Sequence, residues 1–387
     1  MDFNFDEIID RNNTNSIKWS LPLSQDVLPM WVADMDFKTA PAVMQALQNR
    51  VAHGVFGYTQ TPAEFYSAII NWWKGRHGFS LQKEWIIPTT GVIPALSAAV
   101  RALVQKGGKV LIQPPVYNHF YNTLKNCGCE IIENNLLYTN GNYVIDFDDL
   151  ETKASDPEVN LFIISNPHNP VGRAWTKEEL KRMGDICLKY DVIIISDEIH
   201  SDLVYADVKH IPFASLGESY SKNAITLGSP TKTFNLAGLQ VGYLFTENKL
   251  FKDKIQKILT LQEIELLSPF AVSALIAAYN DGGAWLEALK TYLYNNYFFL
   301  KEFITTHVPA VNVTPLQATY LVWLDCSSLS RSSVEIAEKL LKEHQLWVNP
   351  GTMYGEAGEG FLRVNIACPR KLLFEGLTRL SKGLTKA

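Results

Sequence analysis

Three polar side chains of different chemistry follow three successive apolar runs in the middle third of the chain. They are Asn169 after Leu161–Ser165, Asp197 after Val192–Ser196, and Lys232 after Ala224–Gly228. If the runs are neighbouring parallel strands, their carboxyl ends lie at one edge of a sheet and the side chains converge there. An amine, a carboxylate and an amide at one place can hold an aromatic aldehyde, because the amine bonds to its carbonyl carbon and the others fix ring atoms.

The elements that must position these side chains are buried strands and the helices between them. A fourth mainly apolar run is Lys109–Gln113, and helices are expected over Val92–Gln105 and Thr176–Tyr190. Strands that are apolar on both faces need cover on both faces, which intervening helices supply in a mostly parallel sheet. We therefore predict an α/β architecture with the functional residues just past the strand ends.

A phosphate site is predicted where a helix begins ahead of these strands. Thr90-Gly91-Val92-Ile93 opens the first expected helix, and backbone N–H groups at such a start bind phosphate with help from the helix dipole. Phosphate, lysine, acid and amide together match the requirements of pyridoxal 5′-phosphate (PLP). The residues therefore predict a PLP enzyme whose catalytic lysine is Lys232.

The individual roles follow from the chemistry of that cofactor. Lys232 would bond to the aldehyde and, once displaced by substrate, carry the Cα proton. Asp197 would keep the pyridine nitrogen protonated, and Asn169 would hydrogen-bond the phenolic oxygen. Tyr117 would stack on the ring, and Ser229, three residues before the lysine, would join the phosphate contacts.

Each of these residues also has an ordinary interpretation. An aspartate after a strand is usually a turn or cap residue, a loop lysine is usually solvated, and an asparagine between prolines usually lies in a turn. We prefer the functional interpretation because these residues fall at successive strand ends in the correct order. For His200, three residues after Asp197, a buried structural histidine and a catalytic one are equally compatible with the sequence.

The order of several motifs resembles a known family. TGVIPAL, PPVYNHF, SNPHNPVG, SDEIH and SPTKTFNLAGLQ are similar, in this order, to motifs of fold-type I PLP enzymes, the aspartate aminotransferase superfamily. The segments WVADMDF (31–37), FGY (56–58) and FLRVNIACP (361–369) resemble the branch of cystathionine β-lyases and C–S lyases. The resemblance runs from about residue 18 to the C-terminus, and the order and spacing make it specific although each motif alone is weak.

The resemblance implies further site residues and a homodimer. Arg363 would clamp the substrate α-carboxylate, with Asn169 and Tyr117 also contacting substrate, although a structural ion pair for Arg363 and core packing for Tyr117 remain alternatives. Tyr58 would reach the cofactor phosphate of the neighbouring subunit. The cofactor contacts predicted in this way are Gly91, Val92, Ile93, Tyr117, Asn169, Asp197, His200, Ser229, Lys232 and Tyr58.

Two positions depart from the aminotransferase pattern. Gln240, eight residues after Lys232, stands where many aminotransferases carry a phosphate-binding arginine. His200 stands where aspartate aminotransferases have tyrosine. Both departures favour the lyase branch, and whether Gln240 binds the phosphate directly stays open.

The length of 387 residues allows two domains. We expect a large PLP-binding domain over residues 46–285, built on the mostly parallel, seven-stranded sheet that is typical of PLP fold type I. A smaller α+β domain is expected from 286–387, joined by the N-terminal segment 1–45. Its predicted elements are strands over Thr319–Asp325 and Phe361–Ile366 and a helix over Ser332–His344.

The branch implies α,β-elimination of L-cystathionine or a related L-cysteine S-conjugate, giving pyruvate, ammonia and a thiol, which is homocysteine from cystathionine. One alternative is an aminotransferase, which uses the same cofactor contacts. Another is a regulatory PLP-binding protein that acts by contacting a partner. The sequence offers no added DNA-binding or partner domain in support of that last possibility.

Composition and charge bound the remaining possibilities. With 47% hydrophobic and 19% charged residues the chain is globular, and its net charge of −5 gives no reason to expect nucleic-acid binding. Five cysteines without framework or zinc spacing predict free thiols and no metal site. An acidic N-terminus and apolar runs below ~18 residues predict no signal peptide, no membrane span and a cytoplasmic protein with a small amino-acid substrate.

Overall fold

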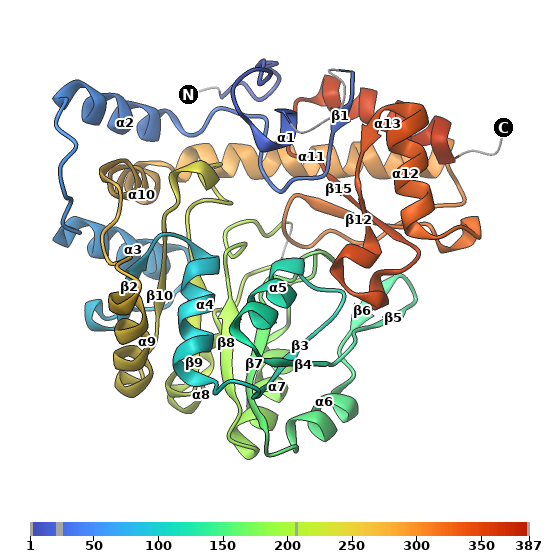
Figure 1. The fold of residues 1–387 in the computed structure, drawn as a ribbon. Coiled ribbons are helices and arrows are strands. Elements are labelled where there is room, and N and C mark those ends of the chain that lie inside the picture. Colours follow the sequence, from blue (N-terminus) through green and yellow to red (C-terminus); the bar gives the residue numbers. More distant parts are fainter. Residues whose placement is uncertain (1–2, 21–25, 206–207, 385–387) are drawn as a thin grey trace.

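The computed structural model describes residues 3–20, 26–205 and 208–384. Its main feature is a seven-stranded sheet in which β10 runs antiparallel to both neighbours and the other adjacent pairs are parallel (Figure 1). In spatial order the strands are β2 (Ile86–Thr89), β10 (Gly242–Phe245), β9 (Ala224–Gly228), β8 (Ile193–Asp197), β7 (Val159–Ser165), β3 (Lys109–Ile112) and β4 (Glu130–Glu133). The predicted mostly parallel sheet is confirmed.

Alternate residues of the central strands pack into two different cores, one on each face of the sheet. In β7, Leu161 and Ile163 belong to one core and Phe162 and Ile164 to the other, and all four are fully buried. The first core is covered by α4 (Val92–Leu103), α5 (Asn118–Cys127) and α9 (Lys249–Leu261), and the second by α6 (Phe147–Ala154), α7 (Lys177–Lys189) and α8 (Glu218–Lys222). This two-sided burial is the physical reason for the continuously apolar runs.

A second, antiparallel sheet lies above the first and combines the two ends of the chain. Its order is β11 (Asn312–Val313), β12 (Leu321–Asp325), β15 (Phe361–Asn365) and β14 (Asn349–Pro350). Beside it, β1 (Leu28–Pro29) pairs in parallel with β13 (Leu346–Trp347). The helices around it are α11 (Gly283–His307), α12 (Ser333–His344) and α13 (Arg370–Leu384).

The pairing of β1 with β13 supports the predicted small domain built from both chain ends. Its boundaries near residues 45 and 285 stay a prediction. Residues 1–2, 21–25 and 385–387 of the predicted outer segments lie outside the described residues, as does the start of the acidic N-terminus.

The remaining elements connect or flank the two sheets. Helix α2 (Pro41–His53) packs on α10 (Pro269–Asp281), and α3 (Ala63–His77) packs on the same helix. The short elements are α1 (Ile17–Ser20), β5 (Leu137–Thr139), β6 (Asn142–Val144), and 3₁₀ turns η1 (Lys83–Trp85), η2 (Phe213–Leu216), η3 (Ala237–Leu239), η4 (Ser327–Leu329), η5 (Gly351–Tyr354) and η6 (Glu356–Gly358). Within the described part of the chain, no helix is both long and apolar enough to cross a membrane.

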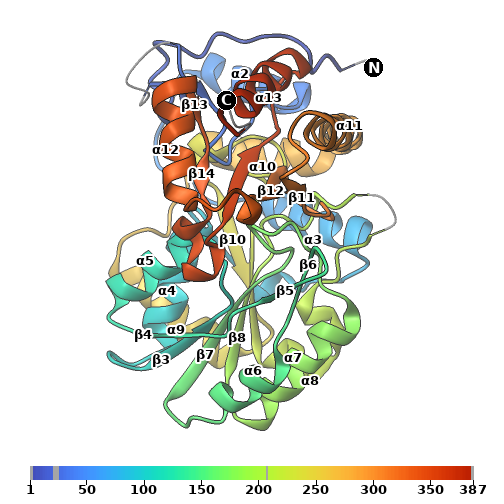
Figure 2. The same ribbon diagram turned by 90° about the vertical axis from the view of Figure 1, so that its right-hand side faces the viewer.

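The carboxyl ends of β7, β8 and β9 lie at one edge of the large sheet and point toward the small sheet (Figure 2). The segment after β7 reaches the connection before β12, where the N–H groups of Gln317 and Ala318 donate to Gly172 O. The functional segments predicted from the sequence therefore lie between the two sheets.

Candidate active site

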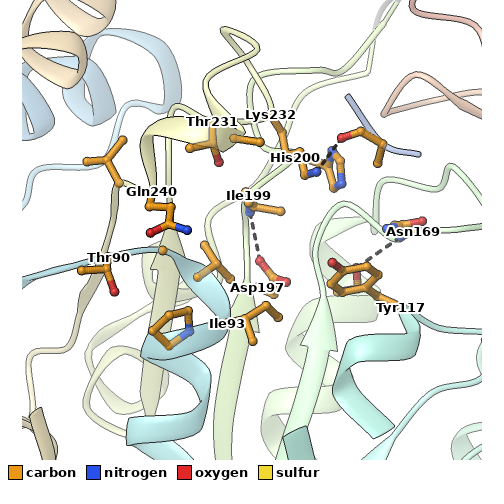
Figure 3. A pocket seen from close by; sticks show the side chains of 17 residues that line it. Thr90, Ile93, Tyr117, Asn169, Asp197, Ile199, His200, Thr231, Lys232 and Gln240 are labelled. Atoms are coloured by element: carbon orange, nitrogen blue, oxygen red, sulfur yellow. Dashed lines mark hydrogen bonds between the residues drawn. The ribbon is translucent and has the colours of Figure 1, made fainter. Parts of the chain in front are cut away.

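A cavity of about 370 Å³ opens at the carboxyl ends of these strands (Figure 3). Separate parts of the chain contribute predicted site residues to its lining, namely Gly91, Val92, Ile93, Tyr117, Asn169, Asp197, His200 and Lys232. The amine, the carboxylate and the amide that the sequence singled out thus share one cavity.

Lys232 enters this cavity from the loop that follows β9. Its ammonium group donates a hydrogen bond of 2.6 Å to Ala33 O. The pKa of Lys232 is lowered to about 8, mainly by burial and also by Arg363, although Asp34 and Asp197 act in the opposite direction. An amine with this pKa is far more often neutral near pH 7 than an exposed lysine, which suits a nucleophile and a proton carrier.

Asp197 ends β8 with a side chain that is almost fully buried. The N–H of Ile199 donates to its Oδ1 at 3.2 Å, the one hydrogen bond to this carboxylate among the described residues. Burial raises the pKa of Asp197 to about 7, and the Ile199 N–H and the Lys232 amine lower it only in part. The carboxylate is therefore poor in donors, so a cationic N–H group placed in the cavity would stabilise its charged form.

The N-terminal end of α4 forms the opposite end of the cavity. Gly91 precedes the helix with a φ of 146°, a conformation that favours glycine, and the first amides of the helix, at Val92 and Ile93, have no carbonyl in the preceding turn to donate to. A side chain at Gly242 would lie 3.0 Å from Gly91 Cα, so the start of β10 approaches this turn closely. The result is a backbone cradle suited to an anion.

Gln240 has a left-handed conformation with φ of 51° and directs its side chain toward this end of the cavity, near Thr90 (Figure 3). Its amide is therefore close to the cradle, although no hydrogen bond from it reaches α4 within the described residues. Direct phosphate binding by Gln240 stays open.

Arg363 arrives from β15 of the small sheet and is not among the residues that line the cavity, but it contacts Asn169, which is. Its Nη1 donates to Asn169 Oδ1 at 3.2 Å and its Nη2 donates to Trp31 O at 2.9 Å. The guanidinium lies 4.7 Å from the Tyr354 ring centroid. Its Nε is buried without a hydrogen-bond partner among the described residues. Arg363 is thus held in place by neutral groups, and no carboxylate of the described residues forms an ion pair with it, so its charge is available to an anionic ligand.

His200 and Tyr117 line the cavity as uncharged groups. The pKa of His200 is lowered to about 3, mainly by burial and also by the nearby charges of Lys232 and Arg363. Its Nδ1 is buried without a partner among the described residues. Burial raises the pKa of Tyr117 to about 12. The choice between a structural and a catalytic histidine therefore stays open, but the side chain does face the cavity.

Two predicted cofactor contacts lie outside the cavity lining. Ser229 Oγ donates to Val241 O at 2.6 Å and lies 2.7 Å from Thr231 Oγ1, and it is Thr231 that lines the cavity. Tyr58 is 99% exposed in the irregular segment between α2 and α3. The roles predicted for Ser229 and Tyr58 stay predictions.

The reasoning from strand ends did not assign a role to the backbone of segment 31–37. Besides Lys232, the hydroxyl of Tyr320 donates to Ala33 O, at 3.0 Å. Asn365 Nδ2 donates to Val32 O and Asp34 O at 2.5 and 2.6 Å. The acceptors are backbone carbonyls, which every residue type carries, so side-chain type could not identify them. In the sequence, only the resemblance of the WVADMDF motif pointed to this segment.

Comparison with known proteins agrees with this geometry. The family model "Aminotransferase class I and II" matches residues 25–380. The chain is 43% identical over 386 residues to cystathionine beta-lyase PatB of Bacillus subtilis (strain 168), covering 99% of this chain and all of that protein. Two solved structures superpose with TM-scores of 0.96 and 0.93: cystalysin from Treponema denticola, which contains PLP (34% identical, 99% of both chains), and the PLP-bound C–S lyase from Staphylococcus hominis (33% identical, 100% and 99%).

The chain belongs to the aminotransferase class I and II family. Within that family it is a PLP-dependent C–S lyase of the group that includes the cystathionine β-lyases. The predicted fold type, cofactor and enzyme class are confirmed.

The residues present fit PLP. Asp197 is a buried carboxylate whose raised pKa a cationic ring nitrogen would offset. Lys232 is an amine with a lowered pKa in the same cavity. The glycine-led start of α4 is a cradle for a phosphate group. Lys232 would hold the aldehyde carbon, Asp197 the ring nitrogen, and α4 the phosphate.

Proposed function

We propose that this lyase cleaves the Cβ–S bond of L-cysteine S-conjugates such as L-cystathionine. With water, the reaction yields pyruvate, ammonia and a thiol. The observation that carries the proposal is that Lys232, Asp197 and Asn169 line one cavity, and that Arg363 donates a hydrogen bond to the Asn169 side chain.

In this proposal the α-carboxylate of the substrate binds Arg363, because a guanidinium held by neutral partners retains its full charge. Lys232 removes the Cα proton, and its pKa of about 8 lets it return that proton to the leaving sulfur. PLP supplies a protonated aromatic ring that accepts the electron pair released at Cα. Asp197 keeps that ring protonated.

The same proposal includes a homodimer in which Tyr58 reaches the phosphate end of the neighbouring subunit's cavity. The exposure of Tyr58 supports it, together with that of Val55 and Phe56, which are 63% and 53% exposed in the same segment. Large apolar side chains grouped in this way are typical of a protein–protein contact. The cytoplasmic location is a prediction as well.

A substrate panel tests the reaction. Purified protein loaded with PLP is mixed with L-cystathionine, L-cystine, L-cysteine and S-alkyl cysteines, and pyruvate and free thiol are measured. We expect both products, in equal amounts, from at least one thioether conjugate. Added 2-oxoglutarate that yields glutamate without thiol would instead identify an aminotransferase, and no turnover on any member of the panel would favour the regulatory alternative.

Replacing the proposed catalytic lysine is the most severe change. Lys232→Ala should lower kcat by on the order of 10⁴-fold or more, because both the covalent attachment and the proton carrier are lost. The variant should also lack the yellow colour of a lysine-bound cofactor. Lys249→Ala is the matched control, since this side chain is exposed and, within the part of the chain that the structure describes, forms an ion pair with Asp253 alone. Retained turnover in Lys232→Ala would move the catalytic role to another residue.

A subunit-mixing experiment tests the role of Tyr58. Lys232→Ala and Tyr58→Ala dimers are unfolded together, refolded and loaded with PLP. If each cavity takes Tyr58 from the partner, mixed dimers contain one intact cavity and activity rises above that of either parent. Activity no higher than the mean of the two parents would place Tyr58 outside the shared site.

A further inference from the structure

A buried polar cluster centred on Asp202 lies outside the cavity lining. The Asp202 side chain is 3% exposed. It accepts hydrogen bonds from Trp72 Nε1 at 3.0 Å and from Thr233 Oγ1 at 2.9 Å. His77 Nε2 and Arg76 Nε lie 3.2 and 3.4 Å from its Oδ1. Four side chains thus converge on one carboxylate.

This convergence keeps Asp202 charged in spite of its burial. Burial raises the pKa of Asp202, but His77, Arg76 and Thr233 outweigh it and the net pKa is below the ordinary value. Three of the four partners come from the last two turns of α3, where Trp72 stacks on Tyr279 with ring centroids 4.8 Å apart. Asp202 is therefore bonded to a buried, closely packed part of the molecule.

The fourth partner connects this anchor to the active site. Thr233 directly follows Lys232, and Asp202 lies five residues after Asp197. Among the described residues, the bond from Thr233 Oγ1 to Asp202 Oδ2 is the one hydrogen bond that joins segment 197–203 to segment 229–236. One end of the bond belongs to the loop of the carboxylate and the other to the loop of the amine.

We propose that Asp202 is a positioning residue that, through the Thr233 hydroxyl, holds Lys232 at the correct place relative to Asp197. The proposal rests on the catalytic role proposed for Lys232. Its physical reason is that a catalytic group displaced by about 1 Å can lose on the order of 10²-fold in rate, so loops that carry cooperating groups need a fixed connection. Asp202 itself touches neither substrate nor cofactor in this proposal.

Removal of the single hydroxyl tests the connection in the PLP-loaded enzyme. Thr233→Val keeps the shape of the side chain and deletes the donor. We expect the pH midpoint of the visible absorption of the lysine-bound cofactor to shift by about half a pH unit or more, because the amine changes its surroundings. We also expect kcat to fall by about tenfold with a smaller change in KM. Thr233→Ser, which keeps the hydroxyl, should restore both values, and Thr233→Ala is a second deletion that adds no methyl group in place of the hydroxyl.

Thr246→Val is the matched control. Thr246 is also a buried threonine, 2% exposed, and its hydroxyl donates a hydrogen bond of 2.8 Å to Ala224 O. Neither residue belongs to segment 197–203 or segment 229–236. The control should lower the unfolding midpoint of the cofactor-free protein as much as Thr233→Val does. It should leave the absorption titration and kcat at wild-type values.

Two results would overturn the proposal. One is a wild-type absorption titration and kcat in both Thr233→Val and Thr233→Ala. The other is an equal shift in Thr246→Val, which would show that any lost buried hydrogen bond has this effect. The absorption titration needs only bound PLP, so it reports on the positioning role even if no cysteine conjugate is turned over. A wild-type chain that forms no lysine-bound cofactor would instead reject the proposed function itself.

Discussion

Asp197 and Asp202 stand at the two ends of one short loop, and both side chains are almost completely buried. Their surroundings differ in the number of donors. Asp197 accepts one backbone N–H among the described residues, and burial raises its pKa to about 7. Asp202 is met by two neutral donors, a histidine and an arginine, and its pKa is lowered although it is buried as deeply.

The difference shows that burial alone does not set the charge of a carboxylate. Desolvation disfavours the charged form of both residues, and the donors and cations within reach decide whether that cost is offset. Asp202 has its donors and cations within the protein fold and needs no ligand to stabilise its charge. Asp197 faces the cavity with its charge only partly compensated, which is the condition expected of a group that binds a cationic ligand.

The largest effect expected to distinguish Asp197 from Asp202 is on the reaction rate. Asp197→Ala should lower kcat of the PLP-loaded enzyme at least ~10²-fold, about 3 kcal/mol of lost transition-state stabilisation, because the ring is no longer kept protonated. The free energy of unfolding of the cofactor-free variant, measured in urea, should not fall. A near-normal kcat would mean that another group protonates the ring.

Asp202→Asn, unlike Asp197→Ala, should lower the free energy of unfolding. The amide cannot neutralise Arg76, and it offers one acceptor oxygen in place of two, so the free energy of unfolding should drop by about 2–3 kcal/mol, as for a lost charged hydrogen-bond network. Urea unfolding of the cofactor-free protein measures it. Asp253→Asn is the control, because its exposed pair with Lys249 should contribute less than about 1 kcal/mol. Equal losses in both variants would contradict the comparison.

The pH dependence of stability sharpens the comparison further, because the two pKa shifts have opposite signs. The stabilisation from Asp202, whose folded pKa is lowered, is present above the ordinary value of 3.8 and is lost as the pH falls through the folded value. The cost of ionising Asp197, whose folded pKa is raised, grows as the pH rises from 3.8 to about 7.

Urea unfolding of the cofactor-free proteins between pH 3 and 8 measures both effects. Relative to wild type, Asp197→Asn should gain stability as the pH rises through this window. Asp202→Asn should approach the wild type only at the acid end. Parallel curves for the two variants would show that both carboxylates have the same charge in the folded protein.

Much of the fold was predictable because its strands are apolar on both faces. The prediction of Ala224–Gly228 matches β9 residue for residue, and those for β7 and β8 differ by one or two residues at their ends. Strand ends fray and depend on pairing partners, which the local pattern does not contain. The antiparallel place of β10 between β2 and β9 was not predicted, since nothing in a four-residue apolar run distinguishes the two directions.

The candidate site was predictable where its chemistry depends on side chains at strand ends, as for Asn169, Asp197 and Lys232. It was not predictable where backbone carbonyls act, as at Ala33, or where the partner is far away in sequence. Asp202 follows the recognisable Asp197 by five residues, yet its partners Trp72 and Thr233 lie 130 residues before it and 31 residues after it. Gln240 remained ambiguous because its position relative to α4 depends on a turn with positive φ.

The sequence by itself determined which functional groups this protein has and that three of them leave neighbouring strands, because residue type and apolar patterning are local properties. Only the tertiary structure decided which of the two buried aspartates is surrounded by donors and cations, and that the hydroxyl beside Lys232 donates to it. Those properties depend on donors and cations that α3, β8 and the loop after β9 bring within about 3 Å of one another, and hydrogen bonding acts only at that range.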